Sequence, residues 1–427
     1  MAAGGNVPSD VEMDRDSACG YRRNPNAQAA FDEAASRLRE VDGWLGPDGE
    51  RTLVADLALE GGGVKGIGLV GAVLVLAEAG YRFRCVAGTS AGAIAATLIA
   101  AISKSGGALQ DLRRYLGSLD FNQFMREGKV HRILDYVGGK AGSLAVDAAI
   151  LSHKMGLYSG DYLGEWLTPI LHGELGVRTF GDLRLTVEDD PGMSVPVGHD
   201  YRLLVHTSDI TRGQLVHLPW DYPLYGSESD PQDVVTAVRA SMSIPFFFEP
   251  VTFSAQSADV SVPGPGGRPI AQHYEAGTVT WVDGGMLRNF PINAFDRADG
   301  APPRWPTIGI KLSSFQTMFS ATKGCESSLA VGLHCLHTLL NEWDAYAVDE
   351  ATAARTIFVD NGGLTATEFE LTQDQQDMLF LNGVQAATSF VVEMSEAGRV
   401  PRTAAEGFAL ARTRLPPSRQ GIESAAN

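Results

Sequence analysis

The sequence predicts an α/β protein with a mostly parallel central sheet and a helical insertion, and three observations support this fold class. Short β-type runs alternate with helical patterns from residue 53 onwards, as in chains that build parallel sheets. A glycine-rich segment joins the first predicted strand to the first helix. The stretch 105–202 contains several helical patterns but no convincing strand, which predicts a helical insertion over one end of the sheet.

The expected elements can be placed in order along the chain. Strands are predicted at 53–59, 83–87, 201–207, 214–218, 279–282, 307–312 and 356–359, with helices at 67–79, 91–103 and 233–242. A further amphipathic helix is predicted at 27–45. One helix separates the first two strands, so we expect them to be parallel neighbours joined by a right-handed crossover.

Composition and charge exclude several classes of protein. A formal net charge of −17 disfavours nucleic acid as a partner, because such binding needs Lys and Arg to neutralise phosphates. No apolar run reaches the ~20 residues of a membrane span. The first residues lack the features of a secretory signal, so we expect a cytoplasmic location. The four cysteines show no metal-ligand spacing and are interpreted as reduced thiols.

The glycine-rich segment 60–66 follows a strand and opens a helix, a geometry that presents backbone N–H groups to negative charge. It matches the GxGxxG pattern of dinucleotide sites, but the next strand does not end in the acidic residue that would bind ribose. It is not a P-loop either, because Gly66 follows Lys65 where Ser or Thr would bind magnesium. The segment is therefore predicted to stabilise an anion that forms during a reaction.

The second strand ends in Gly88-Thr89-Ser90-Ala91-Gly92, a GxSxG sequence at a predicted strand-to-helix turn. Such a turn presents the serine hydroxyl above the sheet, and glycines two positions away on either side avoid collisions as the chain reverses. Ser90 is therefore the candidate nucleophile. The anion-binding loop on the neighbouring strand would lie at the same edge of the sheet, as acyl transfer requires.

Asp283 ends an apolar strand and precedes two glycines, so it can approach Ser90 as the base. A triad in the order Ser, Asp, His would need His334 or His337, both in an apolar helical stretch. We therefore favour a dyad in which the carboxylate alone accepts the serine proton. An aspartate with an ordinary pKa of ~3.9 would be a weak base for this step.

The glycine loop, the Gly-Thr-Ser-Ala-Gly elbow and the Asp-Gly-Gly strand end, in this order, resemble the patatin-like phospholipases of the bacterial type. Further matching segments lie at 156–160, 211–213, 240–245 and 285–291. The resemblance implies a three-layer α/β/α fold and a Ser-Asp dyad without a metal or other cofactor. It implies an oxyanion hole formed by Gly61, Gly62, Gly63, Lys65 and Gly66, with Ser90 and Asp283 as the catalytic pair.

The resemblance also implies a domain organisation and a function. We expect an N-terminal extension at 1–50 that is partly disordered, a catalytic domain at 51–395 and a C-terminal tail at 396–427. The expected activity is hydrolysis of carboxylic esters in glycerophospholipids, of phospholipase A or lysophospholipase type, through a serine acyl-enzyme. The residues indicate no oligomeric state.

Five alternatives stay open at this point. A non-lipid carboxylesterase or an acyltransferase would use the same nucleophile and loop. A phospholipase effector could require an activating ligand, and a regulatory protein could keep the fold without turnover. A dinucleotide-dependent oxidoreductase is the weakest alternative, because the acidic residue that would bind ribose is missing. The basic, aromatic segment 121–136 is either a solvated helix face or a peripheral contact with a membrane surface.

Overall fold

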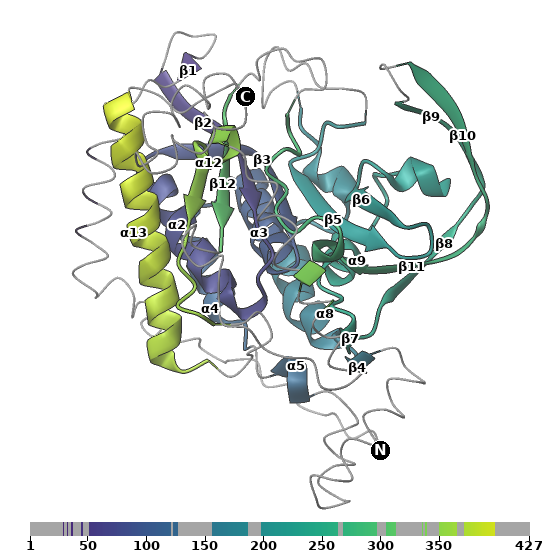
Figure 1. Cartoon of the computed structure of the whole chain (residues 1–427), viewed down its shortest axis with the longest axis horizontal. Coiled ribbons are helices and arrows are strands. Elements are labelled where there is room, and N and C mark those ends of the chain that lie inside the picture. The colour runs from purple at the N-terminus through teal and green to yellow at the C-terminus, as the bar shows by residue number, and fades with distance from the viewer. Residues whose placement is uncertain are drawn as a thin grey trace, which may run out of the picture.

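The computed structural model of the chain has a nine-stranded sheet at its centre, with helices packed against it (Figure 1). The structure describes residues 51–120, 123–126, 156–186, 198–263, 268–296, 305–312, 350–364 and 371–397, with single positions 29, 32, 36, 44, 45, 335, 338 and 339. Several regions lie outside these residues: most of the two terminal regions, most of the segment 121–136, and the two histidines considered for a triad, His334 and His337.

The main path of the sheet runs in the order β13-β12-β2-β3-β5-β11-β8, with β1 on β2 and β6 on β5. The strands are β1 (Trp44–Leu45), β2 (Arg51–Leu59), β3 (Tyr81–Thr89), β5 (Leu203–Asp209), β6 (Gln214–Leu218), β8 (Val251–Ala255), β11 (Gly277–Asp283), β12 (Thr307–Lys311) and β13 (Thr356–Phe358). The five strands from β13 to β5 are parallel, whereas β1, β6, β8 and β11 run antiparallel to their neighbours. The predicted mostly parallel sheet flanked by helices is confirmed.

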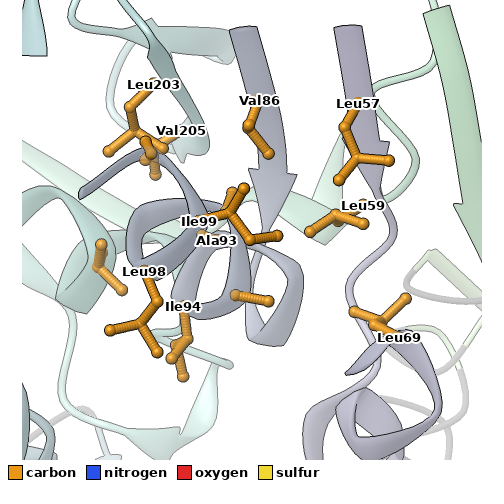
Figure 2. Close-up of a cluster of buried hydrophobic side chains, with 14 of the residues drawn as sticks. Leu57, Leu59, Leu69, Val86, Ala93, Ile94, Leu98, Ile99, Leu203 and Val205 are labelled. Atoms are coloured by element: carbon orange, nitrogen blue, oxygen red, sulfur yellow. The ribbon is translucent and has the colours of Figure 1, made fainter. Parts of the chain in front are cut away.

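Helix α3 (Ala91–Ser105) packs on the face of the sheet formed by β2, β3 and β5. Figure 2 shows Leu59, Val86 and Val205 directed from these strands toward Ala93 and Ile99 of the helix. All five side chains are fully or almost fully buried. Burial of such side chains, worth about 1.5–3 kcal/mol for each large one, fixes α3 and with it the strand-to-helix turn at its start.

Helices α2 (Ile67–Glu78) and α13 (Gln373–Ala397) lie side by side at one end of the sheet (Figure 1). Their backbones meet at glycines: an added Cβ at Gly71 would lie 2.2 Å from the Phe380 oxygen, and one at Gly383 would lie 2.0 Å from the Gly68 oxygen. Helix α13 was not predicted from the sequence. Gly383 in the middle of α13 lowers the helix propensity of the segment, and the helix is stabilised by its packing against α2.

The opposite face of the sheet holds a smaller buried cluster of Ala58, Phe290 and Ile292. Ala58 lies between two residues that face α3, and alternation along the strand turns it to the other side. The segment after β11 thus packs beneath the end of β2. This contact brings the loop after β11 close to the loop after β2.

The insertion is largely helical in its described parts, as predicted. It contains α4 (Asp111–Gly117), α5 (Gln123–Arg126), α8 (Asp161–Thr168), the π-helix η3 (Pro169–Glu174) and the 3-10 helix η4 (Phe180–Leu183). The expectation of no strand was wrong, because β4 (Gly156–Tyr158) pairs with β7 (Phe246–Phe248). Three residues that pair outside the main sheet are too few to give a period-2 signal.

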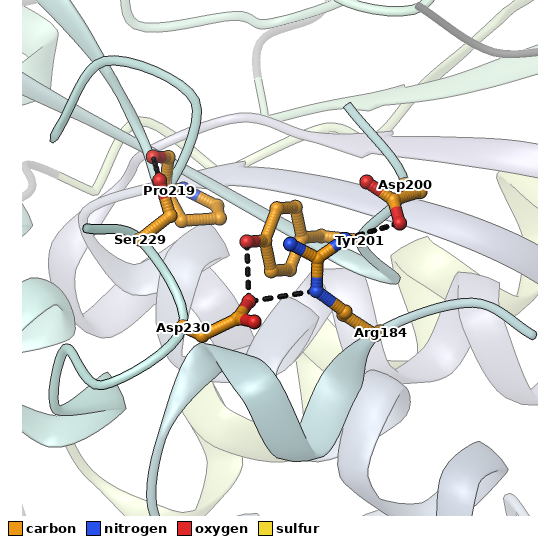
Figure 3. Close-up of polar contacts among 6 residues, drawn as sticks. All are labelled: Arg184, Asp200, Tyr201, Pro219, Ser229 and Asp230. Carbon is orange, nitrogen blue, oxygen red and sulfur yellow. Dashed lines mark hydrogen bonds and ion pairs between the residues drawn. The ribbon is translucent and has the colours of Figure 1, made fainter. Parts of the chain in front are cut away.

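Polar contacts attach the end of the insertion to the sheet. Asp230 Oδ1 accepts a hydrogen bond of 2.7 Å from Arg184 Nε and one of 2.6 Å from the Tyr201 hydroxyl (Figure 3). Arg184 also forms an ion pair with Asp200. Tyr201 is buried, but the Arg184, Asp200 and Asp230 side chains are partly exposed, so their ion pairs fix the position of the chain more than they stabilise the fold.

The remaining elements lie mainly around the antiparallel half of the sheet. They are η2 (Gly63–Gly66), η5 (Tyr222–Tyr225), α9 (Val234–Ser241), β9 (Ala258–Pro263), β10 (Pro269–Tyr274), η7 (Gly284–Met286) and α12 (Glu350–Ala353). Strands β9 and β10 form a separate antiparallel hairpin beyond β8 (Figure 1).

Trp44 and Leu45 form β1 and not the end of the helix predicted at 27–45. Within β7, Phe248 is buried, whereas Phe246 is 38% exposed. None of the described helices has the length and apolar character needed to cross a membrane.

Candidate active site

Ser90 occupies the sharp turn between β3 and α3. Its backbone angles are φ 53° and ψ −123°, in a region that non-glycine residues rarely adopt and that costs about 1–3 kcal/mol. Its N–H donates to the Ser241 hydroxyl over 2.9 Å, which helps to hold this conformation. The side chain is almost buried, and the N-terminal end of α3 is directed toward it. The predicted nucleophile therefore sits in a strained elbow.

The glycines of the elbow lie where no side chain fits. A Cβ at Gly88 would come within 2.2 Å of the Gly92 carbonyl oxygen. A Cβ at Gly92 would lie 2.4 Å from the carbonyl oxygen of Leu59 on the neighbouring strand. Both contacts are with backbone atoms that cannot move aside, so the turn requires glycine at these two positions.

The glycine loop lies against the elbow, because β2 and β3 are parallel neighbours and both end at this edge. A Cβ at Gly61 would lie 3.1 Å from the Ser90 Cβ, and one at Gly66 would lie 3.2 Å from the Ala91 Cβ. The structure thus brings the loop and the elbow together at one edge of the sheet.

The loop offers backbone donors that are not used elsewhere. Gly62 is buried, and Gly63 has a φ of 55° at the start of η2. The N–H of Lys65 donates to the Gly62 oxygen over 3.2 Å, but the N–H groups of Gly62 and Gly63 donate to no acceptor in the described part of the chain. A buried N–H group without an acceptor is costly and rare. A ligand oxygen could supply the acceptor that these two groups lack.

A buried cluster of charges supports the loop from below. Glu60 forms an ion pair with Lys311 and accepts a hydrogen bond of 2.6 Å from the Leu312 N–H. Lys65 is 6% exposed, and burial lowers its pKa, an effect that Glu60 opposes and Lys311 reinforces. The carboxylate fixes the end of β2 to the end of β12, directly before the glycines.

Asp283 ends β11 and is 1% exposed. Its Oδ1 accepts a hydrogen bond of 2.7 Å from the Gly285 N–H, whereas the buried Oδ2 has no partner of ordinary hydrogen-bond geometry in the described structure. Burial raises the pKa of this carboxyl to about 7, although the nearby Ser90 side chain and the Gly285 N–H favour the ionised form. The ordinary pKa assumed from the sequence therefore does not apply.

The turn at the end of α9 connects the elbow to Asp283. Ser241 Oγ accepts from the Ser90 N–H and donates to the His206 carbonyl over 2.6 Å. Two residues later, the Ser243 carbonyl accepts from the Asp283 N–H over 2.9 Å. One short turn thus sets the backbone positions of both predicted catalytic residues. The segment 240–245 matches the family pattern in the sequence, but its serines had no predicted role.

Thr89 links the elbow to the segment after β11, because its hydroxyl donates to the Arg288 carbonyl over 3.3 Å. His206 pairs with Thr89 across the sheet, and its ring is buried with both nitrogens unpartnered in the described structure. Burial holds the pKa of His206 well below its usual value. None of the histidines in the described residues hydrogen-bonds to Ser90 or Asp283.

The described residues contain no group of three or more His, Cys, Asp or Glu side chains that could hold a metal ion. The groups that the structure gathers at this site are a hydroxyl, a carboxylate of raised pKa and backbone N–H donors. Together these groups can transfer an acyl group through a covalent intermediate.

The chain is similar to several known proteins. A family model described as "Patatin-like phospholipase" matches residues 57–296, a span that includes the glycine loop, Ser90 and Asp283. The "Uncharacterized protein YqhO" of Bacillus subtilis (strain 168) is 30% identical over 339 residues, which cover 79% of this chain and 97% of that protein. The crystal structure of VipD from Legionella pneumophila aligns with a TM-score of 0.39 at 15% identity, covering 82% of this chain and 70% of that chain.

Proposed function

The chain belongs to the patatin-like phospholipase family, and we propose that it is a serine acyl hydrolase that cleaves carboxylic esters of glycerophospholipids. In this proposal, Ser90 is the nucleophile, Asp283 is the base, and the Gly62 and Gly63 N–H groups form the oxyanion hole. One observation carries it: a strained, buried serine lies beside a buried carboxylate whose Oδ2 has no other partner in the described structure.

In the first half-reaction, Ser90 Oγ attacks the ester carbonyl carbon while its proton passes to Asp283 Oδ2. The carbonyl oxygen becomes an oxyanion and accepts hydrogen bonds from the loop. The tetrahedral intermediate then collapses, and the carbon–oxygen bond to the alcohol breaks. Asp283 returns the proton to the departing oxygen, which leaves an acyl group on Ser90.

In the second half-reaction, water attacks the acyl-enzyme and gives its proton to Asp283. The new tetrahedral intermediate collapses to a fatty acid, and Ser90 recovers its proton. No electron is gained or lost in either step. The sum is hydrolysis of one ester bond by one water molecule.

The raised pKa of Asp283 supports its assignment as the base. A carboxylate with a pKa of about 7 accepts a proton from a hydroxyl more readily than one with an ordinary pKa, and half of it is still ionised near neutral pH. A single oxyanion donor contributes about 3–4 kcal/mol to the barrier reduction in enzymes of this kind. Both contributions depend on the exclusion of water, and Ser90 and Asp283 are almost fully buried.

The lipid substrate is proposed from the family, whose model is described as "Patatin-like phospholipase". Two apolar side chains close in sequence to the proposed site are exposed: Phe246 follows the Ser243 turn and is 38% exposed, and Leu287 follows Asp283 and is 40% exposed. The segment 121–136, for which the sequence left open a solvated helix face or a peripheral contact with a membrane surface, lies outside the described residues apart from 123–126.

The test is fatty-acid release from mixed phospholipid vesicles and from a soluble ester, in excess EDTA. Wild type, Ser90→Ala and Asp283→Asn are compared at equal concentration, and circular dichroism checks that the variants fold. We expect both variants to lose release from both substrates. Asp259→Asn is the matched control, since its side chain is 88% exposed on the β9–β10 hairpin.

Other outcomes would redirect the assignment. Cleavage of the soluble ester without release from vesicles would favour a carboxylesterase, and acyl transfer to an added alcohol would favour an acyltransferase. Activity that appears only after addition of a cell extract would favour an effector with an activating ligand. Release that survives Ser90→Ala would contradict the proposed nucleophile.

A further inference from the structure

Asn289 joins the two loops of the site through a pair of hydrogen bonds. Its side-chain Nδ2 donates to the Gly61 carbonyl over 2.9 Å, and its backbone carbonyl accepts from the Gly61 N–H over 3.1 Å. Asn289 is 9% exposed, so the side-chain bond is shielded from water. The two residues are 228 positions apart in the sequence.

The side-chain bond acts on one particular peptide unit. The carbonyl of Gly61 and the N–H of Gly62 belong to the same planar trans peptide, so they point in opposite directions. A donor that holds the carbonyl therefore also fixes the direction of the N–H. That N–H is buried and donates to no acceptor among the described residues.

The same peptide lies against the predicted nucleophile. A Cβ at Gly61 would lie 3.1 Å from the Ser90 Cβ and 2.2 Å from Asn289 Oδ1. The absence of a side chain at Gly61 thus allows both Ser90 and Asn289 to approach this peptide. Donation to the carbonyl also polarises the peptide and strengthens its N–H as a donor.

We infer that Asn289 is a positioning residue that orients the Gly62 N–H toward the oxyanion formed on Ser90. This inference rests on the proposed function. It assigns the side chain a role in transition-state stabilisation through the backbone, without contact with the substrate. The backbone bond from Gly61 to the residue 289 carbonyl would remain in any variant, so the side chain can be tested separately from loop attachment.

Two substitutions remove the donor in different ways. Asn289→Ala deletes the side chain, whereas Asn289→Asp keeps its shape but places a carboxylate oxygen against the Gly61 carbonyl, which repels it. Both should let the peptide rotate. Asn382→Ala is the matched control, because its Nδ2 donates over 2.9 Å to the Asp360 carbonyl, a bond of the same type outside the site.

The experiment measures kcat and KM for a soluble ester, the inhibition constant of a trifluoromethyl ketone, and that of an unreactive ether analogue. The ketone forms an oxyanion on the serine, whereas the ether does not. We expect both Asn289 variants to lower kcat about 100- to 1,000-fold, with KM changed less than about threefold. Ketone binding should weaken by a similar factor, ether binding should stay constant, and the control should match wild type.

The outcomes separate this inference from its premise. If Ser90→Ala is inactive while both folded Asn289 variants keep wild-type kcat, the positioning role is wrong and the proposed function stands. Equal weakening of ketone and ether binding would show a general loss of structure and would also overturn the role. If Ser90→Ala keeps full activity, the proposed function fails and this inference fails with it.

Discussion

Replacement of Asp283 by asparagine should abolish activity and at the same time stabilise the fold at alkaline pH. The wild-type carboxylate is almost fully buried, and its pKa is raised from 3.8 to about 7. Ionising it inside the folded protein therefore costs more than ionising it in the unfolded chain. The variant retains an oxygen for the Gly285 N–H but carries no charge.

The size of the effect follows from the pKa. A rise from 3.8 to about 7 corresponds to about 4 kcal/mol of lost stability once the group is ionised in both states. Between these two values the folded state binds the extra proton, so wild-type stability falls as pH rises through this window. From about pH 5 to about pH 8, the variant should gain about 2 to 3 kcal/mol relative to wild type.

The change with pH is the quantity to measure, because other differences between the two side chains add a constant. Burial also raises the pKa of Asp56 to about 7, but this group contributes equally to both proteins and cancels. Urea unfolding curves of both proteins at several pH values give the free energies of unfolding. A difference between Asp283→Asn and wild type that stays constant over this pH range would refute the reasoning.

Three further predictions concern groups around the dyad. The kcat/KM of wild type should fall as pH drops through about 7, because Asp283 must be ionised to accept a proton. A pH-rate profile that is flat across this region would contradict its role as base. Ser241→Ala should destabilise the fold by about 1–3 kcal/mol and reduce kcat, because the buried Ser90 N–H loses its acceptor. Urea unfolding measures the loss of stability, and ester kinetics measure kcat. Glu60→Gln should cost about 3–5 kcal/mol by leaving Lys311 buried without its partner, and unchanged thermal unfolding would contradict that pairing.

The parts of the site that could be predicted from the sequence are those with local causes. The turn around Ser90 depends on glycines two residues away, and the loop before α2 depends on consecutive glycines, so both leave a short motif. The parallel pairing of the first two predicted strands, β2 and β3, followed from the helix between them. These local rules place the loop and the elbow at one edge of the sheet, as the structure has them.

The remaining contacts join residues that are far apart in the chain. Ser241 reaches the Ser90 N–H across 151 positions, and Asn289 reaches Gly61 across 228. A serine or an asparagine in the sequence does not indicate such a contact, because both residue types are common in turns. Matches to the segments 240–245 and 285–291 were the one signal present, and they did not show which atoms would meet.

The raised pKa of Asp283 could not be predicted from the sequence either. An aspartate before two glycines is typical of an exposed turn. In the structure, Asp283 is instead buried beside the neighbouring strand β5 and the turn after α9. Its environment depends on how the antiparallel half of the sheet packs. The helix α13 was missed for a similar reason, since its contacts with α2 are tertiary.

Covalent trapping of the acyl-enzyme tests the central claim most directly. The protein is mixed with a slowly hydrolysed fatty-acid ester, quenched in acid and digested, and the peptides are analysed by mass spectrometry. The account predicts one acyl group on the peptide that contains Ser90, formed in wild type and in Asp259→Asn but greatly reduced in Asp283→Asn. Turnover without an adduct on Ser90, or an adduct on another residue that forms at the rate of turnover, would contradict it.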